Sequence, residues 1–254
     1  MLTRRLPILL ATFDPDPVDV ARSVAEMLTT PPSIRARLPG LALLLALLAA
    51  LTPLAFLVDI SVARWAFTTE LPGDLKNLVT LSEVFAHGSG VLLILLAVAA
   101  LDPRSWRVLP RLALGAYGAG LLADLLKFVL ARRRPEAADV MNIEVWDSFQ
   151  GFFAWQNAAT WQEALSRDNL SLPSGHAATA AGLACAMTRL YPRAAWFFVG
   201  ITMLACFQRI AFQAHYLSDV LAGAAVGVLF SLLLELPRLR NWLAGIERPS
   251  RGAT

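Results

Sequence analysis

The stretch LALLLALLAALTPLAFLV, residues 41–58, decides how the rest of the chain is interpreted. It contains no charged side chain and approaches the roughly 20 residues that cross the hydrocarbon core of a bilayer. The whole chain has the same bias, since 57% of its 254 residues are hydrophobic and 16% are charged. A soluble domain carries about 25% charged residues. The pattern therefore predicts a membrane protein rather than a soluble domain with a large core.

Five more apolar blocks follow the first. We therefore expect an all-α fold, an integral membrane bundle of six transmembrane helices. The blocks cover approximately residues 39–60, 83–101, 109–131, 174–191, 194–213 and 216–236. The fourth block is rich in Ala, Gly and Thr, which suits close contact between helices inside a bundle. In the sixth, Gly223 and Gly227 form a small-xxx-small face of the kind that packs against another helix.

The segment before the first span predicts a short amphipathic helix on the membrane surface, with a loosely ordered tail as the alternative. Asp16 can cap this helix, Pro17 suits its first position, and Pro31 ends it. The short apolar run near residue 8 makes a poor signal peptide, so we expect it in the mature chain. We expect a cytoplasmic N-terminal segment (1–38), a transmembrane domain (39–236) and a cytoplasmic C-terminal tail (237–254).

The distribution of positive charge predicts the orientation. Fourteen of the 22 Lys and Arg residues fall at the termini and in the second-to-third and fourth-to-fifth loops, which six spans place on one side. Because the cytoplasmic side carries the excess of positive residues, we expect both termini in the cytoplasm of a multi-pass inner-membrane protein. The scattered arginines form no single basic face, which argues against a nucleic-acid partner.

The two cysteines indicate no metal site. Cys185 and Cys206 lie in separate apolar blocks, where a thiol usually serves packing, and no Cys/His cluster has zinc-like spacing.

Three segments carry charged groups where a span should be apolar. They are KFVLARRRP (127–135), LPSGHAATAAG (172–182) and a segment around residues 209–219. An Arg, Lys or Asp near the centre of a span costs roughly 2.5–3.5 kcal/mol. Six spans bring all three segments to the outer, periplasmic face, so we expect one site there. Separately, each segment has a simpler reading, such as a lysine that snorkels at a helix end.

The residue types at this face suit a phosphate group. Three cations, Lys127, Arg134 and Arg209, match a tetrahedral anion, and the free N–H groups of a helix start near residue 174 add to the cage. His215 precedes Asp219 by four residues, so the carboxylate can accept the ring N–H and fix its tautomer. With two histidines present, one can attack phosphorus and the other can protonate the departing alkoxide. No acidic cluster for Mg²⁺ is visible, so we expect the cations to replace a metal, with no cofactor.

These three segments resemble the signature motifs of the type 2 phosphatidic acid phosphatase superfamily, in particular its membrane lipid phosphate phosphatases. Lys127, Arg134 and Pro135 match the first motif, residues 173–176 (Pro-Ser-Gly-His) match the second, and Arg209 belongs to the third. The third motif continues with His215 and Asp219, but Gln208 stands where the family usually has serine.

The resemblance implies a role for each matching residue. His215 is the nucleophile that forms a phosphohistidine, Asp219 orients it, and His176 is the general acid and later the base. The residues implied to hold the phosphate, without a metal, are Lys127, Arg134, Ser174, Gly175 and Arg209.

We therefore expect a phosphatase that hydrolyses a phosphomonoester or pyrophosphate group on a lipid, such as an isoprenyl pyrophosphate, and that lies among membrane lipids. The alternatives are a phosphotransferase that uses the same intermediate and a non-enzymatic transporter or scaffold.

Three features lie outside the motifs. Asp124 can pair with Lys127, which favours a structural role over one in tuning the site, and His87 near the outer face favours an interfacial histidine over a catalytic one. The aromatic-rich loop 136–172 predicts an interfacial helix beside the site, with an anchoring loop that does not contact substrate as the alternative.

Overall fold

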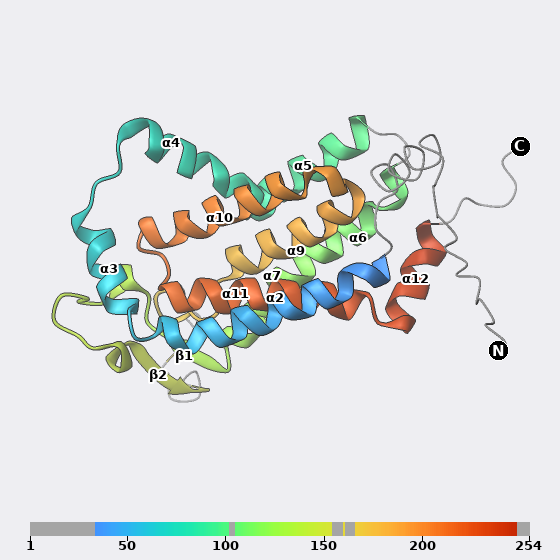
Figure 1. Ribbon diagram of the computed structural model, residues 1–254. Coiled ribbons are helices and arrows are strands. Elements are labelled where there is room, and N and C mark those ends of the chain that lie inside the picture. Colours follow the sequence, from blue (N-terminus) through green and yellow to red (C-terminus); the bar gives the residue numbers. More distant parts are fainter. Residues whose placement is uncertain (1–33, 102–104, 154–159, 161–165, 248–254) are drawn as a thin grey trace, which may run out of the picture.

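The computed structural model describes residues 34–101, 105–153, 160 and 166–247, and most of these residues are helical (Figure 1). Each of the six predicted blocks contains helix, in agreement with the expected all-α class. The long helices are α2 (Ile34–Ala55), α5 (Gly88–Leu101), α9 (Gly175–Leu190), α10 (Ala195–Ala211) and α11 (Leu217–Leu234). The third block is one helical rod of three pieces: α6 (Leu109–Ala113), the π-turn η3 (Leu114–Gly118) and α7 (Ala119–Lys127).

Among the residues that the structure describes, four helical segments are long and apolar enough to cross a membrane, namely Arg37–Ala55, Leu109–Lys127, Pro192–Ala211 and Leu217–Leu234. A fifth is possible if α4 (Gly73–Ser82) and η1 (Glu83–Phe85) join α5 in one broken span, bent by 72°. Helix α9 has 16 residues, fewer than the roughly 20 of a typical span. The six-span count therefore stays a prediction.

Helix α9 lies at the centre of the bundle between α7, α10 and α11 (Figure 1). Its residues from Ala177 to Ala184 are all buried, which its small side chains permit. The predicted small-residue face of α11 contacts it directly. A Cβ atom on Gly223 would lie 2.2 Å from the Ser174 carbonyl oxygen, and one on Gly227 would lie 2.5 Å from that of Ala178. Only glycine permits this approach of the two backbones.

A small sheet, absent from the all-α expectation, lies at the end of the bundle that includes α3 (Asp59–Thr68). Strand β1 (Leu130–Arg132) pairs antiparallel with β2 (Phe149–Phe152), and Arg132 also forms a parallel bridge with Leu170. The loop that follows the third block thus folds back on that block's end. Its described part holds the 3₁₀ turns η4 (Pro135–Ala137), η5 (Val145–Ser148) and η7 (Arg167–Asn169).

Two helix predictions concern residues that the structure does not fully describe. The N-terminal amphipathic helix falls within residues 1–33. The loop 136–172, where the interfacial helix is predicted, is described only at 136–153, 160 and 166–172, so this helix stays a prediction. The segment predicted as a C-terminal tail begins with a helix, α12 (Pro237–Glu247). Arg111 binds this helix to the bundle, because its guanidinium contacts both Glu235 and Glu247, at 3.1 and 2.6 Å. The remaining 3₁₀ turns are η2 (Ser105–Arg107) and η8 (Pro192–Ala194).

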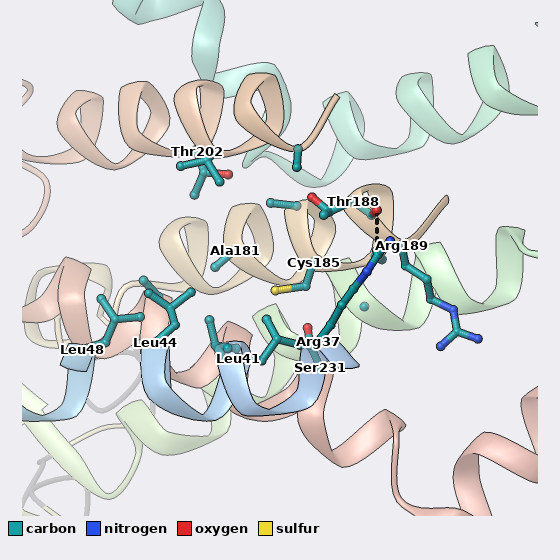
Figure 2. Close-up of a pocket in the computed structure, with 18 of the residues that line it drawn as sticks. Arg37, Leu41, Leu44, Leu48, Ala181, Cys185, Thr188, Arg189, Thr202 and Ser231 are labelled. Carbon is teal, nitrogen blue, oxygen red and sulfur yellow. Dashed lines mark hydrogen bonds between the residues drawn. The ribbon is translucent and has the colours of Figure 1, made fainter. Parts of the chain in front are cut away.

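A cavity of about 640 Å³ lies between α2 and α10, with α9 and α11 among its walls. Figure 2 shows Leu41, Leu44 and Leu48 of α2 facing Thr202 of α10 across Ala181 of α9. At one end the Arg37 guanidinium donates to the Thr188 carbonyl at 2.9 Å (Figure 2). The lining of this cavity is mostly apolar, with Arg37, Arg111 and Arg189 among its polar residues, and it includes none of the predicted site residues.

Candidate active site

The three polar segments predicted to converge do meet at one end of the bundle. The Ser174 N–H donates to the Asp219 carbonyl at 2.9 Å, and the His215 N–H donates to the Arg209 carbonyl at 3.1 Å. A Cβ atom on Gly175 would lie 3.4 Å from the Lys127 Nζ atom. This end also carries the sheet and α3, opposite to α12 (Figure 1).

The cations of the site come from three elements. Lys127 is the last residue of α7, Arg134 precedes η4, and Arg209 lies in the last turn of α10. All three are buried. The Lys127 ammonium contacts the Asp124 carboxylate at 2.7 Å, so the anticipated pairing of these side chains is present. The Arg134 guanidinium lies 3.8 Å from the Glu136 carboxylate, and burial together with Arg167 lowers the pKa of Arg134 to about 10.

The start of α9 has the geometry of a capped helix. Ser174 is its N-cap with an extended backbone, and the Ser174 Oγ atom accepts from the Ala177 N–H at 3.4 Å. The following N–H groups, of Gly175 and His176, belong to the first turn, where the helix itself offers no acceptor. Such a helix start favours a bound anion.

His215 is held in the turn between α10 and α11 by a small hydrogen-bond network. The His215 Nδ1 atom lies 3.8 Å from Asp219 Oδ2, which is too long for the predicted direct hydrogen bond. Ser171 lies between them: its hydroxyl donates to Asp219 Oδ2 at 2.6 Å and lies 3.4 Å from His215 Nδ1. Burial lowers the pKa of His215 to about 4, although Asp219 opposes this shift, so the ring is neutral near pH 7.

Arg132 is an important residue that the sequence pattern did not single out. Its guanidinium is fully buried and contacts Asp219 at 2.7 Å and Asp59 at 2.8 Å. The rings of Tyr216, Phe149 and Phe56 lie over its central carbon, at 3.9, 4.8 and 5.2 Å. The motif spacing identifies Arg134 but gives no signal that separates Arg132 from its exposed neighbour Arg133.

Glu83 is a further residue near the site that the sequence analysis did not predict. Glu83 lies 3.1 Å from Arg209 and 3.6 Å from the ring of His176. Gln208, which stands in place of the family's serine, is buried and hydrogen-bonds to both Glu83 and Arg209. The ring of His87 lies 5.8 Å from that of His176, which places His87 beside the site.

Neither cysteine takes part in this arrangement, because Cys185 and Cys206 are free thiols on α9 and α10. Within the described residues, no group of three or more His, Cys, Asp or Glu side chains has the arrangement of a metal site.

Comparison with known proteins identifies the family. Residues 109–241, more than half of the chain, match the model of the PAP2 superfamily. The chain belongs to this superfamily, which confirms the resemblance seen in the three motifs.

Two similar relatives are named lipid A 1-phosphatase, from Rhizobium johnstonii (strain DSM 114642 / LMG 32736 / 3841) and Rhizobium etli (strain ATCC 51251 / DSM 11541 / JCM 21823 / NBRC 15573 / CFN 42). Each is 34% identical over 117 residues, which are 46% of this chain. The same alignments cover 42% and 44% of the two relatives, so the chain spans less than half of their length.

The fold is similar to a crystal structure described as the first transmembrane PAP2 type phosphatidylglycerolphosphate phosphatase from Bacillus subtilis. The TM-score is 0.52 with 18% sequence identity, and the match covers 84% of this chain and 98% of the other. At this identity the likeness concerns the fold, and it supports a membrane-embedded helical protein.

Proposed function

We propose that this protein is a membrane phosphatase that hydrolyses a phosphomonoester or pyrophosphate group of a lipid through a phosphohistidine at His215. The observation that carries the proposal is the position of His215, which is buried at the end of the bundle where Lys127, Arg134, Arg209 and the start of α9 also lie. A neutral imidazole is a nucleophile, and cations that surround it favour an anionic substrate.

In the first step the His215 Nε2 atom attacks phosphorus, because Nδ1 faces Ser171 and Asp219. The P–N bond forms as the bond from phosphorus to the leaving oxygen breaks. His176 gives its proton to that oxygen, so the lipid leaves as an alcohol or as a phosphate ester. Asp219 stabilises the positive charge that develops on His215.

In the second step a water molecule attacks the phosphohistidine. His176, now neutral, takes the proton of this water as its oxygen bonds to phosphorus, and the P–N bond breaks. Inorganic phosphate leaves, His215 is neutral again and His176 carries its proton. Lys127, Arg134 and Arg209 would hold the equatorial phosphate oxygens in both steps, with Ser174 and the Gly175 N–H.

These cations would take the role that a metal ion has in other phosphoryl-transfer enzymes, so we expect activity in EDTA. The lipid class of the substrate follows from the membrane-spanning helices and from the names of the relatives. Candidate substrates are phosphatidic acid, phosphatidylglycerol phosphate, isoprenyl pyrophosphates and the 1-phosphate of lipid A.

The test is phosphate release from a panel of these lipids by the purified protein in detergent with EDTA. We expect release from at least one lipid, and we expect His215→Ala to abolish it while Arg133→Ala, which changes an exposed neighbour of the site, leaves it unchanged. Retained activity in His215→Ala would exclude His215 as the nucleophile. Absence of release from every lipid would favour the transporter or scaffold, and dependence on added Mg²⁺ would contradict the metal-free site.

A trapping experiment tests the intermediate itself. Acid-labile, base-stable ³²P on the protein, obtained by quenching during turnover, would identify a phosphohistidine, and His215→Ala should remove this label. Repeating the assay with a lipid alcohol in excess separates hydrolysis from phosphoryl transfer, because a phosphotransferase would form a new lipid phosphate.

A further inference from the structure

The break between α4 and α5 brings a carboxylate to the edge of the candidate site. Between η1 and α5 the chain bends by 72°, and Glu83 is the first residue of η1. The turn is tight, since a Cβ atom on Gly90 would lie 2.1 Å from the Val84 carbonyl oxygen. The backbone therefore fixes where the Glu83 side chain starts, next to α10.

Glu83, Gln208 and Arg209 form a closed ring of hydrogen bonds. The Arg209 Nη1 atom donates to Glu83 Oε1 at 3.1 Å and to Gln208 Oε1 at 3.0 Å. The Gln208 Nε2 atom donates to Glu83 Oε2 at 3.2 Å. An amide carries a separate donor and acceptor, so Gln208 can satisfy both partners at once. This gives a physical reason for glutamine where the family usually has serine.

The same carboxylate faces the general acid of the proposed reaction. His176 Nε2 is buried and has no hydrogen-bond partner among the described residues, and Glu83 Oε1 lies 3.6 Å from it. The other titratable groups that act on His176 carry positive charge or can acquire it. They are His87, Lys127, Arg209 and His215.

We propose that Glu83 is a positioning residue that holds Arg209 in place, both directly and through Gln208, and stabilises the protonated form of His176. This inference rests on the proposed function, in which His176 must carry a proton before the ester bond breaks. Burial and the nearby cations Arg209 and Lys127 oppose that proton, and a carboxylate at 3.6 Å favours it. Glu83 would not touch the phosphate, because both are negatively charged.

The decisive comparison is Glu83→Gln, which keeps the shape and removes the charge, against Glu70→Gln as the control. Glu70 is exposed on the segment that precedes α4. We expect Glu83→Gln to lower kcat about tenfold or more with a smaller change in KM, and to move the alkaline limb of the pH–rate profile to lower pH. Glu83→Asp should recover part of kcat, and Glu70→Gln should behave as the wild type.

A measurement without substrate separates this inference from the proposed function. The chain has three histidines, so NMR of histidine-labelled protein in detergent can follow each ring. We expect the titration midpoint of His176 to fall by roughly one pH unit in Glu83→Gln and to stay unchanged in Glu70→Gln. This result would support the role of Glu83 even if no lipid phosphate were hydrolysed.

Two outcomes would overturn the inference. One is an unchanged His176 midpoint in a folded Glu83→Gln protein, or in Glu83→Ala if the first variant does not fold. The other is a lower KM with a higher kcat/KM in Glu83→Gln, which would mean that Glu83 competes with the phosphate for Arg209.

Discussion

Arg132 and Asp219 form an ion pair in which neither side chain is exposed, with Arg132 Nη1 2.7 Å from Asp219 Oδ1. The other oxygen of Asp219 accepts from Ser171 and from the Tyr216 N–H, on the side of His215. Arg132 in turn contacts Asp59 at the start of α3. The carboxylate that we propose orients His215 is therefore itself held by a cation from another segment.

Replacement of Arg132 should destabilise the protein strongly. Arg132→Met would leave Asp59 and Asp219 buried without their cation, and the loss of one partner of a buried pair costs about 3–5 kcal/mol. Thermal unfolding in detergent should show a large decrease in Tm. An assay of phosphate release should show a large decrease in activity. Arg133→Met, next in the chain but exposed, is the matched control and should have little effect. Equal stability of the two variants would mean that the buried network contributes little.

The acid limb of activity should lie well below the ordinary titration range of histidine. Burial lowers the pKa of His215 to about 4, whereas a free histidine titrates at about 6.5. The ring therefore stays neutral, and nucleophilic, until the pH falls to about 4. A profile of kcat/KM against pH measures this, and an acid limb assigned to His215 at about pH 6.5 would contradict it.

The same pKa shift affects stability. Above about pH 6.5 the ring of His215 is neutral in the folded and the unfolded chain, so it makes no pH-dependent contribution. Between about pH 6.5 and 4 the unfolded chain binds a proton that the folded chain does not. The contribution of His215 to the free energy of unfolding should therefore decrease as the pH falls through this window. Denaturation at a series of pH values, compared with His215→Ala, measures the difference.

The contact between α11 and the start of α9 should tolerate no added methyl group. In Gly223→Ala the new Cβ atom would lie 2.2 Å from the Ser174 carbonyl oxygen, so the N-cap of α9 or the whole of α11 must shift. We expect a loss of about 1–3 kcal/mol and a decrease in activity of at least about tenfold. Gly200→Ala on α10 meets no atom within 4 Å and serves as the control. Similar activity in both variants would show that the helices can separate without effect on the site.

The orientation derived from positive charges can be tested with single cysteines in a background without Cys185 and Cys206. Glu70 follows α3, which lies at the site end of the molecule, and Asn241 belongs to α12 at the opposite end (Figure 1). Both residues are exposed. In intact cells with a permeable outer membrane, an impermeant maleimide should label Glu70→Cys and not Asn241→Cys. Labelling of Asn241→Cys alone would contradict the predicted orientation and indicate the opposite one.

Much of the fold could be predicted from the sequence, because a long apolar segment in a membrane has few structures available to it other than a helix. Each predicted block contains helix, and the predicted Gly223 and Gly227 face does contact α9. The sheet was missed because β1 and β2 are short and their pairing joins residues separated by a long loop. Helix α9 was counted as a span because its small residues are apolar, although its 16 residues fall short of the usual length.

The sequence by itself determined the family and the set of motif residues, because phosphate chemistry needs particular side chains at spacings that a single helix or turn imposes. Only the tertiary structure decided which other charges serve the site. Arg132 and Arg133 are adjacent residues of the same type. Arg132 is buried between Asp59 and Asp219, whereas Arg133 is exposed. Glu83 meets Arg209 from 126 positions away. No local pattern encodes such contacts, since they arise where separate helices pack and exclude the solvent.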